Sequence, residues 1–123
     1  MKVYNTQETT KHKIGNYLFE IARANNAKFR DKFRRITQTK QRQIDSHSLT
    51  AAEDDKIMAQ AMAGTILVGW TMVQSSGEPE IPFSLQEAEA TLIEDDVLKE
   101  QIIDISNNYN LFLQKDEDEL VKN

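Results

Sequence analysis

The longest apolar run in the chain is the feature that most constrains its fold. Residues 57–73 read IMAQAMAGTILVGWTMV, and only three of these seventeen side chains are clearly polar. An element that is apolar on nearly all sides must be surrounded by other parts of the protein. Just upstream, Thr50 and Glu53 form a T-x-x-E capping box, which marks the start of a helix. The sequence therefore predicts a central buried helix that includes residues 57–73.

A membrane span is a second interpretation of this run, because its length approaches that of a short transmembrane helix. The flanking residues argue against it, since Asp54 and Asp55 precede the run, Glu78 follows it and no basic cluster marks an orientation. The N-terminal residues also lack the apolar core of a signal peptide. We therefore expect no membrane span, and a length of 123 residues predicts one domain.

Three segments are expected along the chain. Residues 1–13 are polar and carry no apolar period, which predicts a loose arm. Residues 14–113 should form one mainly α-helical domain, with room for a short β element because the side chains alternate over residues 17–22. Residues 114–123, QKDEDELVKN, are acidic and predict a disordered tail.

Charge is distributed unevenly between the two parts of the chain. Residues 1–47 hold eleven Lys and Arg against four Asp and Glu, a net charge of +7. Residues 48–123 hold four against sixteen, a net charge of −12. The two parts of one fold could neutralise each other, or the basic part could meet an acidic protein or a nucleic acid. Composition leaves all three interpretations open.

A basic helix is predicted over residues 27–45. Phe29, Phe33 and Ile36 recur on it at spacings of four and three and form a narrow apolar stripe. This stripe fits either a contact with the core or a groove for a partner helix. The remaining surface of the helix would carry the basic side chains of Lys28, Arg30, Lys32, Arg34, Arg35, Lys40 and Arg42.

Two more helices are expected after a loop. Ser84 and Glu87 form a second capping box, which starts a short helix. Asp95 or Asp96 caps a last helix over about residues 97–113. The apolar face of the short helix is Leu85, Ala88 and Leu92, and that of the last helix is Leu98, Ile102, Ile105, Tyr109 and Phe112.

The sequence shows no motif for catalysis. It has no cysteine, which excludes thiolate metal sites and a cysteine nucleophile. His12 and His47 have no Ser or Asp partner in a recognisable motif. The acidic pairs at residues 54–55 and 95–96 fall in first helical turns, where acidic residues favour the helix dipole. We therefore expect no enzyme activity, no catalytic residue, no cofactor and no metal site.

An ordered series of short motifs follows the start of the apolar run. It consists of Gly-Trp at residues 69–70, Ile-Pro-Phe-Ser at residues 81–84 and Leu-Ile at residues 92–93. This series resembles the tail assembly chaperones of long-tailed bacteriophages. The segment FEIARANNAKF at residues 19–29 is also similar to the strand, turn and basic helix of that family. The resemblance covers roughly residues 17–113.

Two departures from the family pattern occur in the loop before the second motif. Ser76 precedes Gly77 where many members have an acidic residue, and Pro79 lengthens the loop. Neither change interrupts the series of predicted helices.

The resemblance implies a non-enzymatic role in tail assembly. Members of this family bind the tape measure protein, a long chain with apolar stripes, while the tail tube assembles, and they are absent from the mature virion. The resemblance further implies self-association, the tail tube protein as a partner through a frameshift-extended form, and the cytoplasm of the infected bacterial host as the location.

Candidate partner-binding residues come from the basic helix and from the loop. Trp70 either packs beneath the following loop or is exposed as a partner anchor. Two other functions stay open: a nucleic-acid-binding or packaging accessory that uses the basic helix, and a permanent structural tail or connector protein of the virion. The candidate residues are Phe29, Phe33, Ile36, Trp70, Pro79, Ile81, Pro82 and Phe83.

Overall fold

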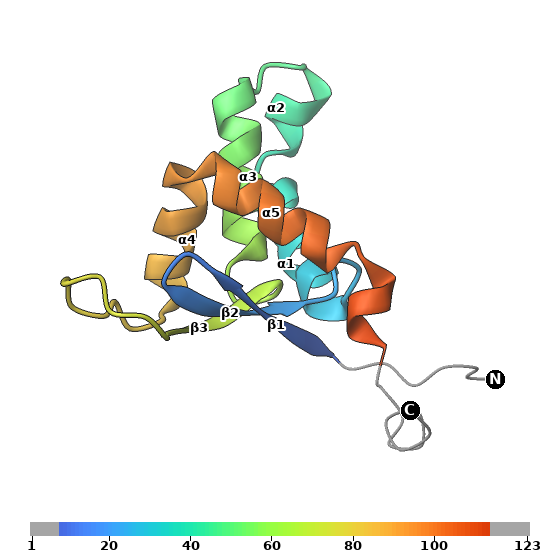
Figure 1. Ribbon diagram of the computed structural model, residues 1–123. Coiled ribbons are helices and arrows are strands. Elements are labelled where there is room, and N and C mark those ends of the chain that lie inside the picture. Colours follow the sequence, from blue (N-terminus) through green and yellow to red (C-terminus); the bar gives the residue numbers. More distant parts are fainter. Residues whose placement is uncertain (1–7, 114–123) are drawn as a thin grey trace.

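The computed structural model describes residues 8–113 of the chain. These residues form helices and a three-stranded antiparallel sheet (Figure 1). The fold is therefore mixed α/β, and the prediction of a mainly α-helical domain was wrong. None of the described helices is long and apolar enough to cross a membrane. In chain order the elements are β1 (Thr9–Ile14), β2 (Tyr17–Ala22), α1 (Ala27–Thr39), α2 (Gln41–Asp45), α3 (Ala51–Met62), β3 (Leu67–Met72), α4 (Leu85–Glu94), α5 (Asp96–Ser106) and the 3₁₀ turn η1 (Tyr109–Phe112).

The central apolar run divides into a helix and a strand. Helix α3 ends at Met62, and Gly64 follows with a φ of +81°, which L-residues rarely adopt. Beyond this glycine the run is rich in β-branched and aromatic residues, which pack well in strands. That part forms β3 at one edge of the sheet. The prediction of one buried helix through residues 57–73 was therefore wrong.

The first strand lies in the segment that was expected to be a loose arm. Residues 9–14 pair along their whole length with β2, and Gly15, with a φ of +61°, takes part in the two-residue hairpin turn. The prediction of a loose arm over residues 1–13 was wrong for this part. Residues 1–7 and the acidic tail expected at residues 114–123 lie outside the described residues.

Strand β2 is the middle strand of the sheet, and it confirms the β element predicted from the alternation of side chains. Phe19 and Ile21 are buried on its core side. Strand β3 pairs with it so that Trp70 lies opposite Phe19 and Leu67 lies opposite Ile21. One face of the sheet thus carries large apolar side chains from two adjacent strands.

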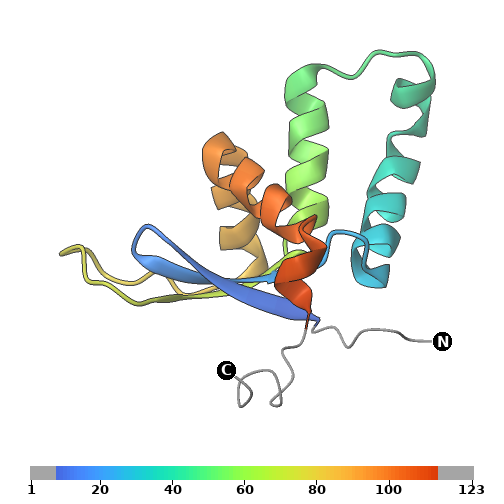
Figure 2. The same ribbon diagram turned by 45° about the vertical axis from the view of Figure 1, so that its right-hand side comes forward.

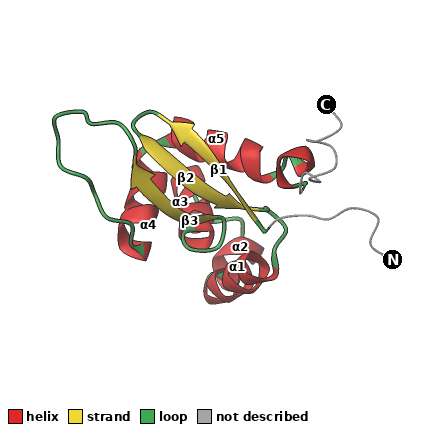
Figure 3. Cartoon of the chain, turned by 60° about the horizontal axis from the view of Figure 1, so that its bottom comes forward, coloured by secondary structure: helices red, strands yellow, loops and turns green. Residues whose placement is uncertain are grey.

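Helices α3, α4 and α5 pack on this face of the sheet (Figure 3). Lys99 on α5 is only 4% exposed, and its ammonium lies 3.5 Å from a carboxylate oxygen of Asp55 on α3 and 3.8 Å from one of Asp96. This charged contact joins α5 to α3. The buried core cluster consists of Phe19, Ile21, Ala59, Met62, Ala63, Ile66, Leu67, Ala88, Leu92, Leu98 and Ile102.

Three helix starts were predicted correctly from local sequence. The Thr50 side chain accepts a hydrogen bond from the N–H of Glu53, and Ser84 accepts one in the same way at the start of α4. Asp95 caps α5. The last helix is shorter than predicted, because α5 ends at Ser106 and η1 follows. Tyr109, expected on the core stripe, is therefore 49% exposed.

Helices α1 and α2, residues 27–45, form an arm that leads away from the sheet and returns through α3 (Figure 2). The predicted basic helix is confirmed, but it is divided into two consecutive helices. We name α1 and α2 together the basic arm. No residue of either helix is buried. The Nδ2 of Asn26, the residue that caps α1, donates to the Thr65 carbonyl oxygen at 2.9 Å, and the Lys32 Nζ donates to that of Ala63 at 2.7 Å.

Candidate partner-binding site

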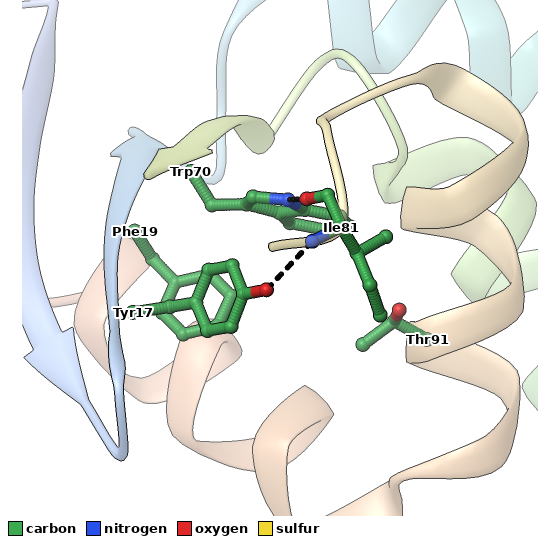
Figure 4. A pocket seen from close by; sticks show the side chains of 5 residues that line it. All are labelled: Tyr17, Phe19, Trp70, Ile81 and Thr91. Carbon is green, nitrogen blue, oxygen red and sulfur yellow. Dashed lines mark hydrogen bonds between the residues drawn. The ribbon is translucent and has the colours of Figure 1, made fainter. Parts of the chain in front are cut away.

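Aromatic side chains fix the loop between β3 and α4. The indole Nε1 of Trp70 donates to the carbonyl oxygen of Ile81 at 2.7 Å, and the N–H of Ile81 donates to the Tyr17 hydroxyl at 2.9 Å (Figure 4). Phe83 packs edge-on against Trp70, with the ring centroids 4.9 Å apart. Both backbone polar groups of Ile81 are thus held by side chains from the sheet.

A small apolar cleft lies beside this cluster. Its volume is about 130 Å³. Apolar cavities of similar volume, about 150 Å³, bind a benzene-sized group, so the cleft suits one apolar side chain of a partner. Figure 4 shows the residues that line it: Tyr17, Phe19, Trp70, Ile81 and Thr91.

Trp70 takes the first of its two predicted positions. It is partly buried and packs beneath the following loop. It reaches the loop from a strand, however, and not from the end of a helix. The rings of Tyr17 and Phe19 lie edge-on to it, with centroid distances of 6.3 and 6.0 Å. Trp70 therefore positions the loop, on which the Ile81 side chain is half exposed to solvent.

Several large apolar side chains are exposed on the loop, on α4 and at the start of α5. Ile81 is 51% exposed, Leu85 57%, Ile93 41% and Val97, at the start of α5, 71%. We name these four residues the loop–α4 face. Ile81 lies beside the apolar cleft, whereas Leu85 and Ile93 lie on another side of α4. Large exposed apolar side chains on neighbouring segments are candidates for contact with a partner protein.

Only Ile81 of these four residues is among the partner-binding candidates that the sequence predicts. Leu85 was assigned to the core face of the short helix with Ala88 and Leu92, but only the latter two are buried. Leu85 and Ile93 are eight positions apart and lie on a second face of α4. That spacing could have predicted a second apolar face on α4. The exposure of Val97 could not be predicted in this way, because it depends on the angle between α4 and α5.

The other candidate partner-binding residues lie in two places. Phe29 and Phe33 stack on α1 with ring centroids 5.7 Å apart, and both are partly buried, as is Ile36. Phe29 also packs against the core cluster. Pro79 and Pro82 are exposed on the loop. The stripe on α1 therefore contributes to the contact of the arm with the core, and only the loop residues adjoin the loop–α4 face.

The seven basic side chains predicted to form a charged surface all lie on or between α1 and α2. Lys32 and Lys40 are partly buried and the other five are exposed. Arg34 pairs with Asp31 at 3.6 Å, and both side chains are 65% exposed, so the pair adds little stability. Burial lowers the pKa of Lys32; nearby Arg35 acts in the same direction and Glu89 opposes it.

The chain was compared with protein families, curated proteins and solved structures. The family model described as YdaY prophage protein matches residues 24–123. Neither a curated protein nor a solved structure matches the chain. The family match includes the whole basic arm, α3, β3 and the loop–α4 face. The chain therefore belongs to the YdaY prophage protein family and is of phage origin.

Proposed function

We propose that this protein is a tail assembly chaperone that binds the tape measure protein and keeps it soluble while the tail tube assembles. The family match gives phage origin and no more than that. The tail assembly role is supported by the three motifs at residues 69–70, 81–84 and 92–93, which resemble those of the chaperones.

The observation that carries the proposal is that these three motifs meet in space. Trp70 of the first motif donates to the carbonyl oxygen of Ile81 in the second, and Phe83 packs on the same indole. In the third motif Leu92 is buried in the core, whereas Ile93 is exposed on the loop–α4 face. Trp70 and Phe83 also pack against the core cluster that includes Leu92. Motifs separated by up to 24 positions therefore lie together in the fold, and they expose Ile81 and Ile93 at two sides of α4.

The loop–α4 face suits a chaperone because its side chains are held in place before binding. The loop is fixed by two hydrogen bonds to Ile81, and α4 is anchored in the core through Ala88 and Leu92. Binding to a preorganised surface loses less conformational entropy than binding to a mobile one. A long helical chain with an exposed apolar stripe aggregates unless that stripe is covered. The loop–α4 face offers apolar side chains that could cover it.

The proposal extends to the other properties that the resemblance implies. The protein acts without catalysis, cofactor or metal, associates with further copies, and meets the tail tube protein through a frameshift-extended form. It works in the cytoplasm of the infected host and is absent from the mature virion. Mass spectrometry of purified virions separates this proposal from a permanent structural role, in which the protein would be present.

Co-expression with the tape measure protein of the same phage tests the proposal. We expect the tape measure to become soluble and to co-elute with the chain. Ile81→Asp should reduce both effects, because it places a charge on the loop–α4 face while the backbone bonds of the loop remain. Tyr109→Asp is the matched control, since it adds the same charge at a similarly exposed side chain (49%) that lies on η1. An insoluble, unbound tape measure would refute the proposal.

A nucleic-acid-binding role remains the second candidate because of the basic arm. Five of its Lys and Arg side chains are exposed. Among residues 8–113, only one of these five forms an ion pair, which is Arg34 with Asp31. Contacts with phosphates would give binding to DNA that weakens steeply as salt is raised. Measuring DNA binding at two salt concentrations therefore separates the two candidates.

A further inference from the structure

A groove of about 560 Å³ runs beside α4, where this helix faces the basic arm and α3. It lies on a different side of α4 from the small apolar cleft beside Trp70, to which α4 contributes Thr91. Three helices that are separate in sequence thus build one depression. Its principal lining residues are Leu85, Glu89, Ala90 and Ile93 from α4, Lys32 from α1 and Lys56 from α3.

The wall that α4 supplies has the shape of a helix-docking surface. Leu85 and Ile93 are 57% and 41% exposed, and they stand two helical turns apart with Glu89 between them. Ala90 is small and leaves space beside Ile93. A row of residues spaced by four is the ridge that packs into the groove of a neighbouring helix. The span from Leu85 to Ile93 is about 12 Å, which matches roughly two turns of a partner helix.

The neighbouring helices add positive charge to this apolar wall. Among residues 8–113 neither Lys32 nor Lys56 takes part in an ion pair. Lys32 donates to the Ala63 carbonyl oxygen, and Glu89 is the acidic side chain that lines the same groove. Two basic side chains and one acidic side chain thus line the groove, which gives it an excess of positive charge. Complementary charge across an interface selects the partner and fixes its orientation.

We propose that this groove docks an amphipathic helix of the tape measure protein that carries Asp or Glu beside its apolar stripe. The apolar side chains of the partner contact Leu85 and Ile93, and its carboxylates pair with Lys32 and Lys56. The identity of the partner rests on the proposed function, whereas the chemistry of the groove rests on these side chains alone.

Two synthetic helical probes test the chemistry on the full chain. Both are about 21 residues long, about six turns, and share one leucine stripe, but Glu flanks the stripe in one and Lys in the other. We expect the Glu probe to bind about tenfold more tightly in fluorescence anisotropy. Lys56→Glu should remove this preference, and Ile93→Ser should weaken both probes. Lys11→Glu on β1 is the control, since it makes the same change in net charge away from the groove.

Each alternative outcome overturns the proposal in a recognisable way. Equal binding of the two probes, or an effect of Lys11→Glu as large as that of Lys56→Glu, would show that the groove does not select its partner. Loss of self-association in Lys56→Glu, measured by sedimentation, would assign the groove to a second copy of the chain. Thermal melts of each variant confirm that the fold is kept.

The same variants separate this proposal from the proposed function. If wild type, Lys56→Glu and Ile93→Ser bind the tape measure protein equally, the chaperone proposal stands and the groove assignment fails. If the Glu probe is selected as expected but the wild-type chain leaves the tape measure insoluble and unbound, the chaperone proposal fails and the groove fits another acidic helix.

Discussion

The basic arm and helix α5 are both helical and both amphipathic, yet they are attached to the molecule in different ways. Helix α5 buries Leu98, Lys99, Ile102 and Ser106, whereas no residue of α1 or α2 is buried. The arm is held instead by partly buried side chains and by hydrogen bonds at its base. Elements with few buried contacts open locally at low free energy. The arm therefore supplies the adjustable wall of the groove. Helix α4 supplies a fixed wall, because it is anchored with α5 in the core.

The largest effect should come from a core truncation on the fixed side. Ile102 is fully buried, so Ile102→Ala should lower the free energy of unfolding by about 4 kcal/mol. Ile36→Ala on the arm should cost about 1 kcal/mol, because that side chain is only partly buried. Urea unfolding measures both. Similar losses for the two variants would contradict the difference between the regions.

The next effect concerns the turn at which the arm, α3 and α4 come together. Gly64 has a φ of +81°, and a Cβ added there would collide with the end of the Leu85 side chain. Gly64→Ala should cost about 3 kcal/mol, from backbone strain and from displacement of Leu85. Gly77→Ala is the matched control, since its φ is +87° but nothing lies near its Cβ position. The stability lost in Gly64→Ala beyond that lost in Gly77→Ala measures the cost of displacing Leu85. Equal losses of stability in the two variants would show that the contact with Leu85 is unimportant.

A smaller effect is expected at the base of the arm. Asn26 accepts from the N–H of Phe29 at 2.8 Å and donates to the carbonyl oxygens of Arg23 and Thr65. Asn26→Ala removes the helix cap and the bonds that tie it to neighbouring backbone, which should cost about 2 kcal/mol. Hydrogen exchange should accelerate in α1 more than in α5. Uniform acceleration would mean that the arm unfolds only with the whole protein.

The smallest effect is a pH dependence at the point where the arm joins α3. The backbone N–H and the hydroxyl of Thr50 donate to the Glu53 carboxylate and hold the pKa of that carboxyl below its ordinary value of 4.5. A lowered pKa in the folded state stabilises the protein above the unfolded-state pKa, and this contribution is lost as pH falls through the folded-state pKa.

The variant Glu53→Gln keeps a hydrogen-bond acceptor but does not titrate. Its stability should lie below that of the wild type at neutral pH and approach it on acidification from about pH 7 to about pH 3. Urea unfolding across this range measures the difference. A gap that stays constant with pH would show that Glu53 adds no charge-dependent stability.

Local signals in the sequence predicted the starts of three helices because capping depends on side chains three positions apart. The caps at Thr50, Ser84 and Asp95 are all present. The prediction of one helix over residues 57–73 was wrong because a segment that is apolar throughout has no distinctive period. The signal for a strand was the β-branched composition after Gly64, and it was outweighed by the capping box upstream.

The candidate site was only partly predictable for a different reason. Trp70, Ile81 and Phe83 belong to recognisable motifs, so sequence pointed to the loop. Lys56 and Ile93 come from two helices, and only the packing of α4 beside α3 and the arm brings them to one groove. No spacing along the chain encodes that arrangement.

Hydrogen exchange of the chain, alone and in complex with the tape measure protein, tests the central claim most directly. We expect added protection in residues 81–97 and in the parts of α1 and α3 that carry Lys32 and Lys56, with little change in β1. Protection that appears in β1 and leaves residues 81–97 unchanged would contradict the assignment of the loop–α4 face and the groove as the binding site.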